Sequence, residues 1–260
     1  ENGLKRALST GDFGVKHSSS NKVGVAQVLN RLTYVSSLSH ARRISTPADK
    51  SGKLIPPRKL HNTSWGYFCP AETPEGQSVG LVKNLSYMAH ITIHSNSAPL
   101  YEYVMPHVID IRTLQPSDMY DAVKVFVNGA WVGISENPTE LYHMLKDKKH
   151  KGIINIYTSV IFDYKLKEIR VCNDSGRLTR PLLRVKDNKL TLTQDNLTKL
   201  NSGEIVWDDL LTDCRLPNSV LEYIDPDEQS WALIGTKPRD LLTSTSSNQI
   251  YRYTHVEIHP

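Results

Sequence analysis

Apolar residues recur at helical spacing near the start of the chain. Positions three and four apart share one face of an α-helix, so such a stripe indicates an amphipathic helix. We predict a helix of about five turns between Lys22 and Arg43, ending before Pro47 because proline disfavours helix in the residue that precedes it. The stripe consists of Val25, Val28, Leu29, Leu32, Val35 and Leu38.

This periodicity is lost after the predicted helix. Residues 48–59 combine small, polar and proline residues, a composition typical of a loop. Apolar residues return at 65–68 and 81–93, where we predict short strands separated by two proline turns and a glycine. The first third of the chain is therefore predicted to be a module of helix and loop.

The rest of the chain alternates between strand and helix patterns. Residues 123–133 place an Asn-Gly pair between two apolar runs, the strongest short-range signal for a β-hairpin. Asn137 and Pro138 supply a helix cap and a first helical residue, with Glu140 in the first turn. We therefore predict an α+β fold, a mixed multi-module fragment with β-rich modules and short helices in its second part. Further strands are predicted at 153–162, 166–172 and 178–185, and a short helix at 193–201.

Length and composition exclude several classes of protein. The 260 residues suffice for one or two domains, and 39% apolar with 22% charged residues favours a folded core over disorder. The three cysteines are far apart and form no Cys-x-x-Cys pair, which indicates a reducing compartment and argues against a zinc ribbon. No run approaches the roughly 20 apolar residues of a membrane span, and the polar start is unlike a signal peptide.

Charge is distributed unevenly along the chain. Residues 1–93 hold 12 Lys and Arg against 5 Asp and Glu, a net charge of +7, whereas the remaining 167 residues carry −3. Such an asymmetry suggests that the first part contacts a polyanion. A solvated basic face without a partner is the alternative.

Six cations concentrate within 18 residues, at the end of the predicted helix and in the loop that follows. This arrangement suits contact with phosphates without recognition of bases. The two arginines could also serve only to balance the helix dipole. The six are Arg42, Arg43, Lys50, Lys53, Arg58 and Lys59.

A search for catalytic motifs finds little. The phosphate-binding, dinucleotide-binding, zinc-protease and serine-hydrolase patterns are all missing from the sequence. Glu72 and Glu75 could serve acid–base chemistry or bind a metal. Because both lie in proline-flanked turns, hydrogen bonding to the backbone or pairing with basic residues is the simpler interpretation.

Three collinear segments resemble a known family. They are LSHARR at 38–43, GKLIPPRKLHNTSWG at 52–66 and CPAETPEGQSVGLVKNL at 69–85. In this order they resemble the fork region of the second-largest subunit of multisubunit DNA-directed RNA polymerases. Residues 126–131, 174–182 and 222–225 are similar to its external domains, and 257–260 to the start of its hybrid-binding region. Thr46-Pro47 and residues 59–63 favour the eukaryotic, archaeal and large-DNA-virus branch.

The resemblance implies a division of the chain into three modules. Residues 1–93 would be the end of the protrusion and a fork-like module, and residues 94–190 a first external-like module. Residues 191–260 would be a second external-like module and the start of the hybrid-binding region. The match implies a middle section of a subunit several times longer.

The resemblance also implies roles for the cations. The loop at 46–57 would be the second fork loop, at the downstream edge of the transcription bubble, where Arg43, Lys50, Lys53 and Arg58 hold strand phosphates by charge. Lys50 replaces an arginine often found in the family, which loses a bidentate contact. The segment 17–24 would be the first fork loop, near the hybrid.

The family's active centre lies mainly elsewhere. Glu75 would sit near it and position basic groups rather than bind metal. The catalytic Mg²⁺ is held mainly by the largest subunit in this family, so we expect no metal ligand here. The reaction is nucleotidyl transfer, and the chain alone is not expected to make RNA.

The implied partners are nucleic acid and protein. They are the template and non-template DNA strands, the RNA–DNA hybrid, the largest polymerase subunit and the remainder of the second-largest subunit, with no membrane. The compartment would be the nucleus in a cellular eukaryote, and the cytoplasm or virion for an archaeal or viral chain. Two other classes stay open: a stand-alone nucleic-acid-binding or scaffold module, and a small-molecule enzyme built on Glu72 and Glu75.

Overall fold

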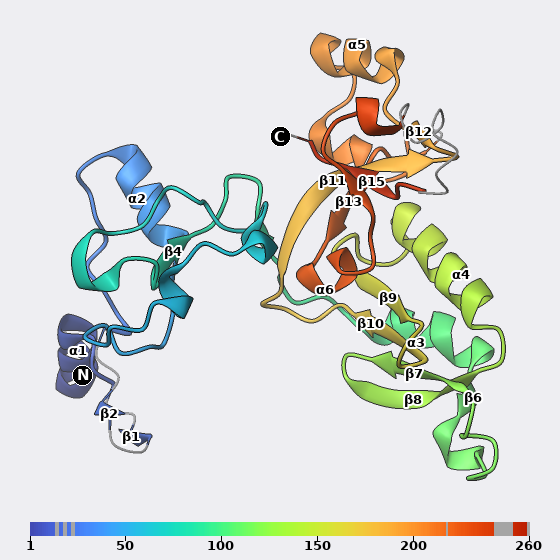
Figure 1. Ribbon diagram of the computed structural model, residues 1–260, viewed down its shortest axis with the longest axis horizontal. Coiled ribbons are helices and arrows are strands. Elements are labelled where there is room, and N and C mark those ends of the chain that lie inside the picture. Colours follow the sequence, from blue (N-terminus) through green and yellow to red (C-terminus); the bar gives the residue numbers. More distant parts are fainter. Residues whose placement is uncertain (14–15, 18–19, 22–23, 217, 242–251, 259–260) are drawn as a thin grey trace. The chain divides into compact units, whose positions relative to one another are not determined.

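The computed structural model describes residues 1–13, 16–17, 20–21, 24–216, 218–241 and 252–258 (Figure 1). It contains helices and several small mixed sheets, so the predicted α+β class is confirmed. The chain forms two compact units. Unit 1 comprises residues 1–61 and 68–85, and unit 2 comprises residues 62–67 and 86–260.

Unit 1 is built from short elements. Helix α1 ends at Thr10 and is capped by Gly11, whose φ of 69° lies in the left-handed region that glycine adopts without strain. Strand β3 pairs antiparallel with β4, so that Arg43 lies opposite Asn84. The elements are α1 (Asn2–Thr10), β1 (Lys16–His17), β2 (Ser20–Asn21), α2 (Tyr34–Ala41), β3 (Arg43–Ser45) and β4 (Val82–Asn84), with 3-10 turns η1 (Pro56–Arg58) and η3 (Gly76–Ser78).

The helix predicted between Lys22 and Arg43 is wrong over residues 24–33, because α2 begins only at Tyr34, and Lys22 and Val23 lie outside the described residues. Thr33 caps it: the Thr33 hydroxyl accepts from the Ser36 amide at 3.1 Å, and the Ser36 hydroxyl accepts from the Thr33 amide at 2.9 Å. The Asn30 carbonyl accepts from the Ser37 hydroxyl at 2.6 Å. The Thr33 and Ser36 side chains satisfy two backbone amides at the start of the helix, so they fix where the helix begins.

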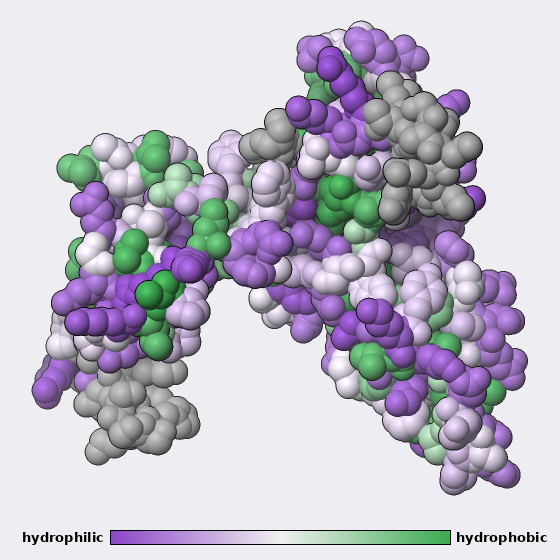
Figure 2. Space-filling model, in the orientation of Figure 1, coloured by the Kyte–Doolittle hydropathy of each residue, from purple (hydrophilic) through white to green (hydrophobic). Residues whose placement is uncertain are grey.

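The apolar stripe that prompted this prediction stays largely in contact with solvent. Val28 is 92% exposed, Leu32 85% and Val35 70%. Because no core among the described residues buries that face, the hydrophobic pattern alone does not stabilise a longer helix. Figure 2 shows apolar residues at the surface among polar ones.

The first sheet of unit 2 has the order β6-β8-β7-β10-β9. The predicted hairpin is confirmed, with Asn128 (φ 49°) and Gly129 (φ 80°) in the left-handed conformation that a tight hairpin turn requires. The predicted helix after Asn137 is α4, and together with α3 it shares one buried core with this sheet (Figure 1). The elements are α3 (Ala98–Val104), β6 (Ile109–Asp110), β7 (Val123–Val127), β8 (Ala130–Ser135), α4 (Pro138–His150), β9 (Ser159–Asp163) and β10 (Glu168–Cys172).

The second sheet of unit 2 forms around the long strand β11. Strands β12, β15, β13 and β5 all pair with β11, and β14 pairs with β15. A second core packs beneath it around Val220 and Leu221. The elements are β5 (His90–Ile91), β11 (Leu178–Lys186), β12 (Lys189–Leu190), α5 (Gln194–Ser202), β13 (Leu221–Ile224), α6 (Pro226–Gln229), β14 (Ile234–Gly235) and β15 (His255–Val256), with the 3-10 turns η2 (Asn62–Ser64), η4 (Met105–His107), η5 (Ile111–Thr113) and η6 (Trp207–Leu210) in the same unit.

Three predicted strands differ from the structure. The strand predicted at 81–93 is reduced to β4 (Val82–Asn84) and β5 (His90–Ile91). The strand predicted at 153–162 begins only at Ser159, because the Asn155 side chain accepts from the Tyr157 amide and closes a turn. At 65–68 the chain forms a turn and a single bridge from Phe68 to Leu85. The predicted strands at 166–172 and 178–185 and the predicted helix at 193–201 are confirmed as β10, β11 and α5. The boundaries of the three modules stay a prediction.

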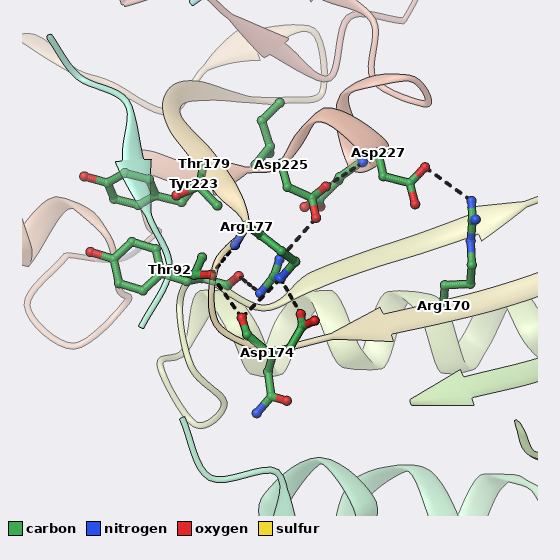
Figure 3. A network of polar contacts seen from close by, with 12 residues as sticks. Thr92, Arg170, Asp174, Arg177, Thr179, Tyr223, Asp225 and Asp227 are labelled. Atoms are coloured by element: carbon green, nitrogen blue, oxygen red, sulfur yellow. Dashed lines mark hydrogen bonds and ion pairs between the residues drawn. The ribbon is translucent and has the colours of Figure 1, made fainter. Parts of the chain in front are cut away.

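Two sequence segments that carried the family resemblance meet in unit 2. Arg177, in the turn before β11, lies 2.7 Å from Asp174 and 3.1 Å from Asp225 (Figure 3). It also donates to the Tyr157 carbonyl at 3.0 Å, and the Thr92 hydroxyl accepts from its amide. One guanidinium therefore ties the turn before β11 to the N-cap of α6, which directly follows β13, and to residue 157, so these motif residues act in folding.

A buried ion cluster joins α4 to β13 and α6. The Lys146 and Lys149 ammonium groups lie 2.7 and 3.0 Å from the Glu222 carboxylate, and both also pair with Glu228. Lys149 is only 2% exposed, and Glu222 and Glu228 are each 5% exposed. Charges removed from water in this way are stable only while they remain paired.

We expect unit 2 to lose stability in acid. Burial lowers the pKa of His150 below its ordinary value of 6.5, so below that pH the unfolded chain binds a proton that the folded chain does not. Burial alone would raise the pKa of Glu222, but Lys146 and Lys149 outweigh it, and the pKa lies well below 4.5. Both shifts favour the folded state at neutral pH, and stability falls as pH drops through 6.5 and then below 4.5.

Urea unfolding curves, recorded by tryptophan fluorescence at pH values from 6.5 to below 4.5, would measure this loss of stability. All four tryptophans lie in unit 2, so the signal reports that unit. In a His150→Gln variant the decline above pH 4.5 should be weaker. A urea midpoint that is constant across this range would contradict the expectation.

Candidate nucleic-acid interface

Strand β3 anchors the first basic residues. The Arg42 amide donates to the carbonyls of Leu38 and Ser39 and closes α2, and its own carbonyl accepts from the Leu85 amide at 3.1 Å. Arg42 is half-buried, whereas Arg43 is exposed on the pairing strand. The backbone of β3 is thus fixed while the Arg43 guanidinium stays accessible.

The loop after β3 is held against the turn that precedes β4. The Thr46 amide donates to the Leu81 carbonyl at 2.8 Å. The Thr73 hydroxyl donates to the Val82 carbonyl and accepts from the Gly80 amide at 2.9 Å. Both ends of the turn at 73–80 are therefore bonded within unit 1.

Three lysines of this loop region are exposed: Lys50, Lys53 and Lys59. Arg58 differs from them, because it is half-buried and its guanidinium donates to backbone carbonyls of unit 1. The structure thus brings the six sequence-predicted cations into one unit, and it leaves four of them exposed to solvent: Arg43, Lys50, Lys53 and Lys59.

The two candidate carboxylates have different environments. The Glu72 carboxylate accepts from the Ser39 hydroxyl, and its carbonyl accepts from the Asn84 side chain at 3.1 Å. Glu72 therefore joins α2 to β4, and its carboxylate partner is a serine hydroxyl rather than the backbone amides or basic residues that its turn position suggested. Glu75 is exposed, and among the described residues no hydrogen-bond or ion-pair partner is found for its carboxylate.

Sequence reasoning missed two residues that shape this interface. Ser39 connects α2 to Glu72, and Gly80 lies against the Arg58 backbone. Both lie inside the motif segments quoted above, at 38–43 and 69–85. The motif therefore marked the segments, but nothing in the sequence indicated these particular contacts.

The described residues do not fit a resident metal. In that part of the chain, no three His, Cys, Asp or Glu side chains come together in a group that could hold an ion. Mg²⁺ prefers one or two carboxylates in an octahedral set of oxygens, whereas Glu72 is committed to Ser39 and Glu75 stands alone. Within the same described residues, no helix has both the length and the apolar character to span a membrane.

Comparison with known proteins defines the class. Family models described as RNA polymerase Rpb2, domains 3, 4 and 5, match residues 27–91, 125–186 and 207–260. The chain is 45% identical to the DNA-directed RNA polymerase II subunit RPB2 of Encephalitozoon cuniculi and 40% identical to its counterpart in Arabidopsis thaliana, each over 99% of the chain. It is 35% identical to DNA-directed RNA polymerase subunit 2 of Acanthamoeba polyphaga mimivirus over the whole chain.

These matches place the chain among subunits of multisubunit RNA polymerases. It belongs to the family of second-largest subunits, as its motifs predicted, and the relatives come from eukaryotes and a large DNA virus. The chain spans between 22% and 23% of the length of these three relatives. All sequence-predicted site residues fall within the first matched segment.

Proposed function

We propose that this chain works as part of the second-largest subunit of a DNA-directed RNA polymerase, and that its unit 1 holds DNA strands and the RNA–DNA hybrid near the active centre. The observation that carries this proposal is the set of exposed cations Arg43, Lys50, Lys53 and Lys59 on a braced strand and loop. A polymerase copies any template, so it must hold phosphates by charge rather than read bases.

The proposal includes a division of labour. The reaction is nucleotidyl transfer, in which metal ions stabilise the attacking and leaving oxygens. We assign the Mg²⁺ to the largest subunit, and to Glu75 a positioning role beside that centre. The largest subunit and the remainder of the second-largest subunit are the protein partners. The compartment is the nucleus for a cellular eukaryotic chain, and the cytoplasm or virion for an archaeal or viral one.

The exposed apolar residues favour this proposal over a stand-alone binding module. Val28, Leu32 and Val35 form an unburied stripe, which a self-sufficient domain would normally cover. Residues 1–260 alone are expected not to extend a primer on a template with Mg²⁺. Primer extension by the purified chain would contradict the division of labour.

Replacing Arg43 tests the phosphate contact. In the assembled polymerase, Arg43→Gln should make complexes with DNA dissociate at lower salt. A plot of the logarithm of the DNA-binding constant against the logarithm of the salt concentration should become less steep. Its slope should lose about 0.9 in magnitude for a duplex phosphate or about 0.7 for a single-strand phosphate. Filter binding or fluorescence anisotropy over a salt series would measure it.

Lys5→Gln provides the matched control. Lys5 also carries an exposed positive charge in unit 1, but it lies on α1 and pairs with Glu1 at 2.8 Å. Its removal should leave the salt slope unchanged. If the salt slope of Arg43→Gln stayed at the parent's value, as is expected for Lys5→Gln, Arg43 would not contact phosphate.

A further inference from the structure

Arg58 uses all of its hydrogen-bond donors inside the protein. A guanidinium carries five N–H donors in a fixed fork, and in this structure five backbone carbonyls accept from them. Nε donates to the Leu54 carbonyl at 3.2 Å. The two terminal nitrogens donate to Gln77 at 2.6 Å and Val79 at 3.1 Å, and to Lys50 at 3.1 Å and Gly52 at 2.8 Å.

These five carbonyls come from two different segments. Those of Lys50, Gly52 and Leu54 belong to the basic loop, and those of Gln77 and Val79 belong to the turn that follows Glu75. The planar fork has donors on two sides, so one side chain can bond both segments at once. Hydrogen bonds from a charged group are also stronger than those between neutral groups.

A glycine allows the same two segments to touch through their backbones. Gly80 has a φ of 73°, and a Cβ added there would lie 2.3 Å from the Arg58 carbonyl oxygen and 2.6 Å from its Cα. No side chain fits in that space without moving the Arg58 backbone. The segments around residues 50–58 and 76–80 are therefore held together at two points.

We propose that Arg58 is a positioning residue that joins the loop bearing Lys50 and Lys53 to the turn bearing Glu75, so that these side chains are presented as one body to nucleic acid. Only the last step of this inference, the presentation of these side chains to nucleic acid, rests on the proposed function. It replaces the role of phosphate ligand that the motif implied for Arg58, since the donors needed for a phosphate are already engaged with carbonyls.

The Arg58→Lys variant separates the positioning role from the role of phosphate ligand. Arg58→Lys keeps the positive charge, which a phosphate contact needs, but its donors sit on one nitrogen and cannot reach carbonyls on both sides. Gly80→Ala disturbs the same junction from the other side and leaves Arg58 in place. Gly76→Ala is the matched control, because Gly76 also has a positive φ, 83°, but nothing lies within 4 Å of its added Cβ.

Hydrogen–deuterium exchange of the assembled polymerase without nucleic acid tests the junction itself. In Arg58→Lys and in Gly80→Ala, amides in residues 50–58 and 76–80 should exchange at least about tenfold faster than in the parent. In Gly76→Ala the exchange of residues 50–58 should match the parent. Unchanged exchange of both segments in Arg58→Lys would overturn the proposal.

Salt titration of DNA binding then tests the consequence. The double variant Lys50→Gln/Lys53→Gln should lower the magnitude of the salt slope by up to about 1.8, which corresponds to two phosphate contacts. The Arg58→Lys variant should also lower it, although it removes no charge. Faster exchange with an unchanged slope in Arg58→Lys, while the lysine pair does lower the slope, would overturn the positioning role. If the lysine pair leaves the slope unchanged, the proposed function of the loop fails, and the exchange result still decides the junction.

Discussion

Replacing Lys149 with alanine is expected to destabilise unit 2 by about 3–5 kcal/mol. The Lys149 ammonium pairs with two buried carboxylates, Glu222 at 3.0 Å and Glu228 at 3.4 Å, and donates to the Tyr223 carbonyl at 2.9 Å. Removing it leaves Glu222 and Glu228 with Lys146 as the remaining ammonium partner. The cost is large because buried carboxylates lose a charge that offset their desolvation.

The urea midpoint of tryptophan fluorescence measures this effect in unit 2. Lys151→Ala is the control, since Lys151 also forms an ion pair with a neighbouring acid, Asp147 at 2.7 Å, but both side chains are half exposed. Because solvent screens such a pair, the urea midpoint of Lys151→Ala should equal that of the parent. Equal midpoints for Lys149→Ala and Lys151→Ala would show that the buried cluster adds nothing to stability.

The second large effect is expected at Arg180, whose replacement by methionine should cost about 3 kcal/mol or more. Arg180 is 4% exposed, lies 2.6 Å from the Glu257 carboxylate and donates to the Gln229 side chain at 2.9 Å. Its guanidinium also lies over the Tyr67 ring, 5.5 Å from the centroid. Methionine keeps much of the side-chain volume but leaves the Glu257 carboxylate buried without its cation.

A double variant isolates this ion pair. Arg180→Met/Glu257→Gln should be more stable than Arg180→Met alone, because the second change removes the unpaired charge. Arg215→Met is the exposed control, since Arg215 pairs with Asp209 at 3.1 Å and its side chain is 64% exposed. If the double variant were no more stable than Arg180→Met, loss of packing rather than of charge would explain the destabilisation.

Local signals in the sequence predicted the elements that depend on neighbouring residues. The Asn-Gly pair located the hairpin of β7 and β8, and Asn137 with Pro138 located the start of α4. In both cases the controlling groups are within a few residues of one another. The conformation of such a turn or cap is determined by residues that the sequence already places together.

The helix at the start of unit 1 shows where this reasoning fails. The apolar stripe predicted about five turns, whereas side-chain caps at Thr33 and Ser36 begin the helix at Tyr34. A hydrophobic pattern extends a helix only if another surface covers its apolar face. In this chain that stripe remains exposed, so the caps decided the outcome.

For the candidate site, the sequence by itself determined the segments, the family and the sign of the charge. Only the tertiary structure decided what each charge does: Arg43, Lys50, Lys53 and Lys59 remain exposed, while Arg58 bonds carbonyls up to 21 residues away. The buried cluster shows the same limit, since Lys149 meets Glu228 across 79 residues. The physical reason is that charge is a property of the residue type, but desolvation and hydrogen-bond partners depend on which distant backbone and side-chain groups the fold brings within about 3 Å.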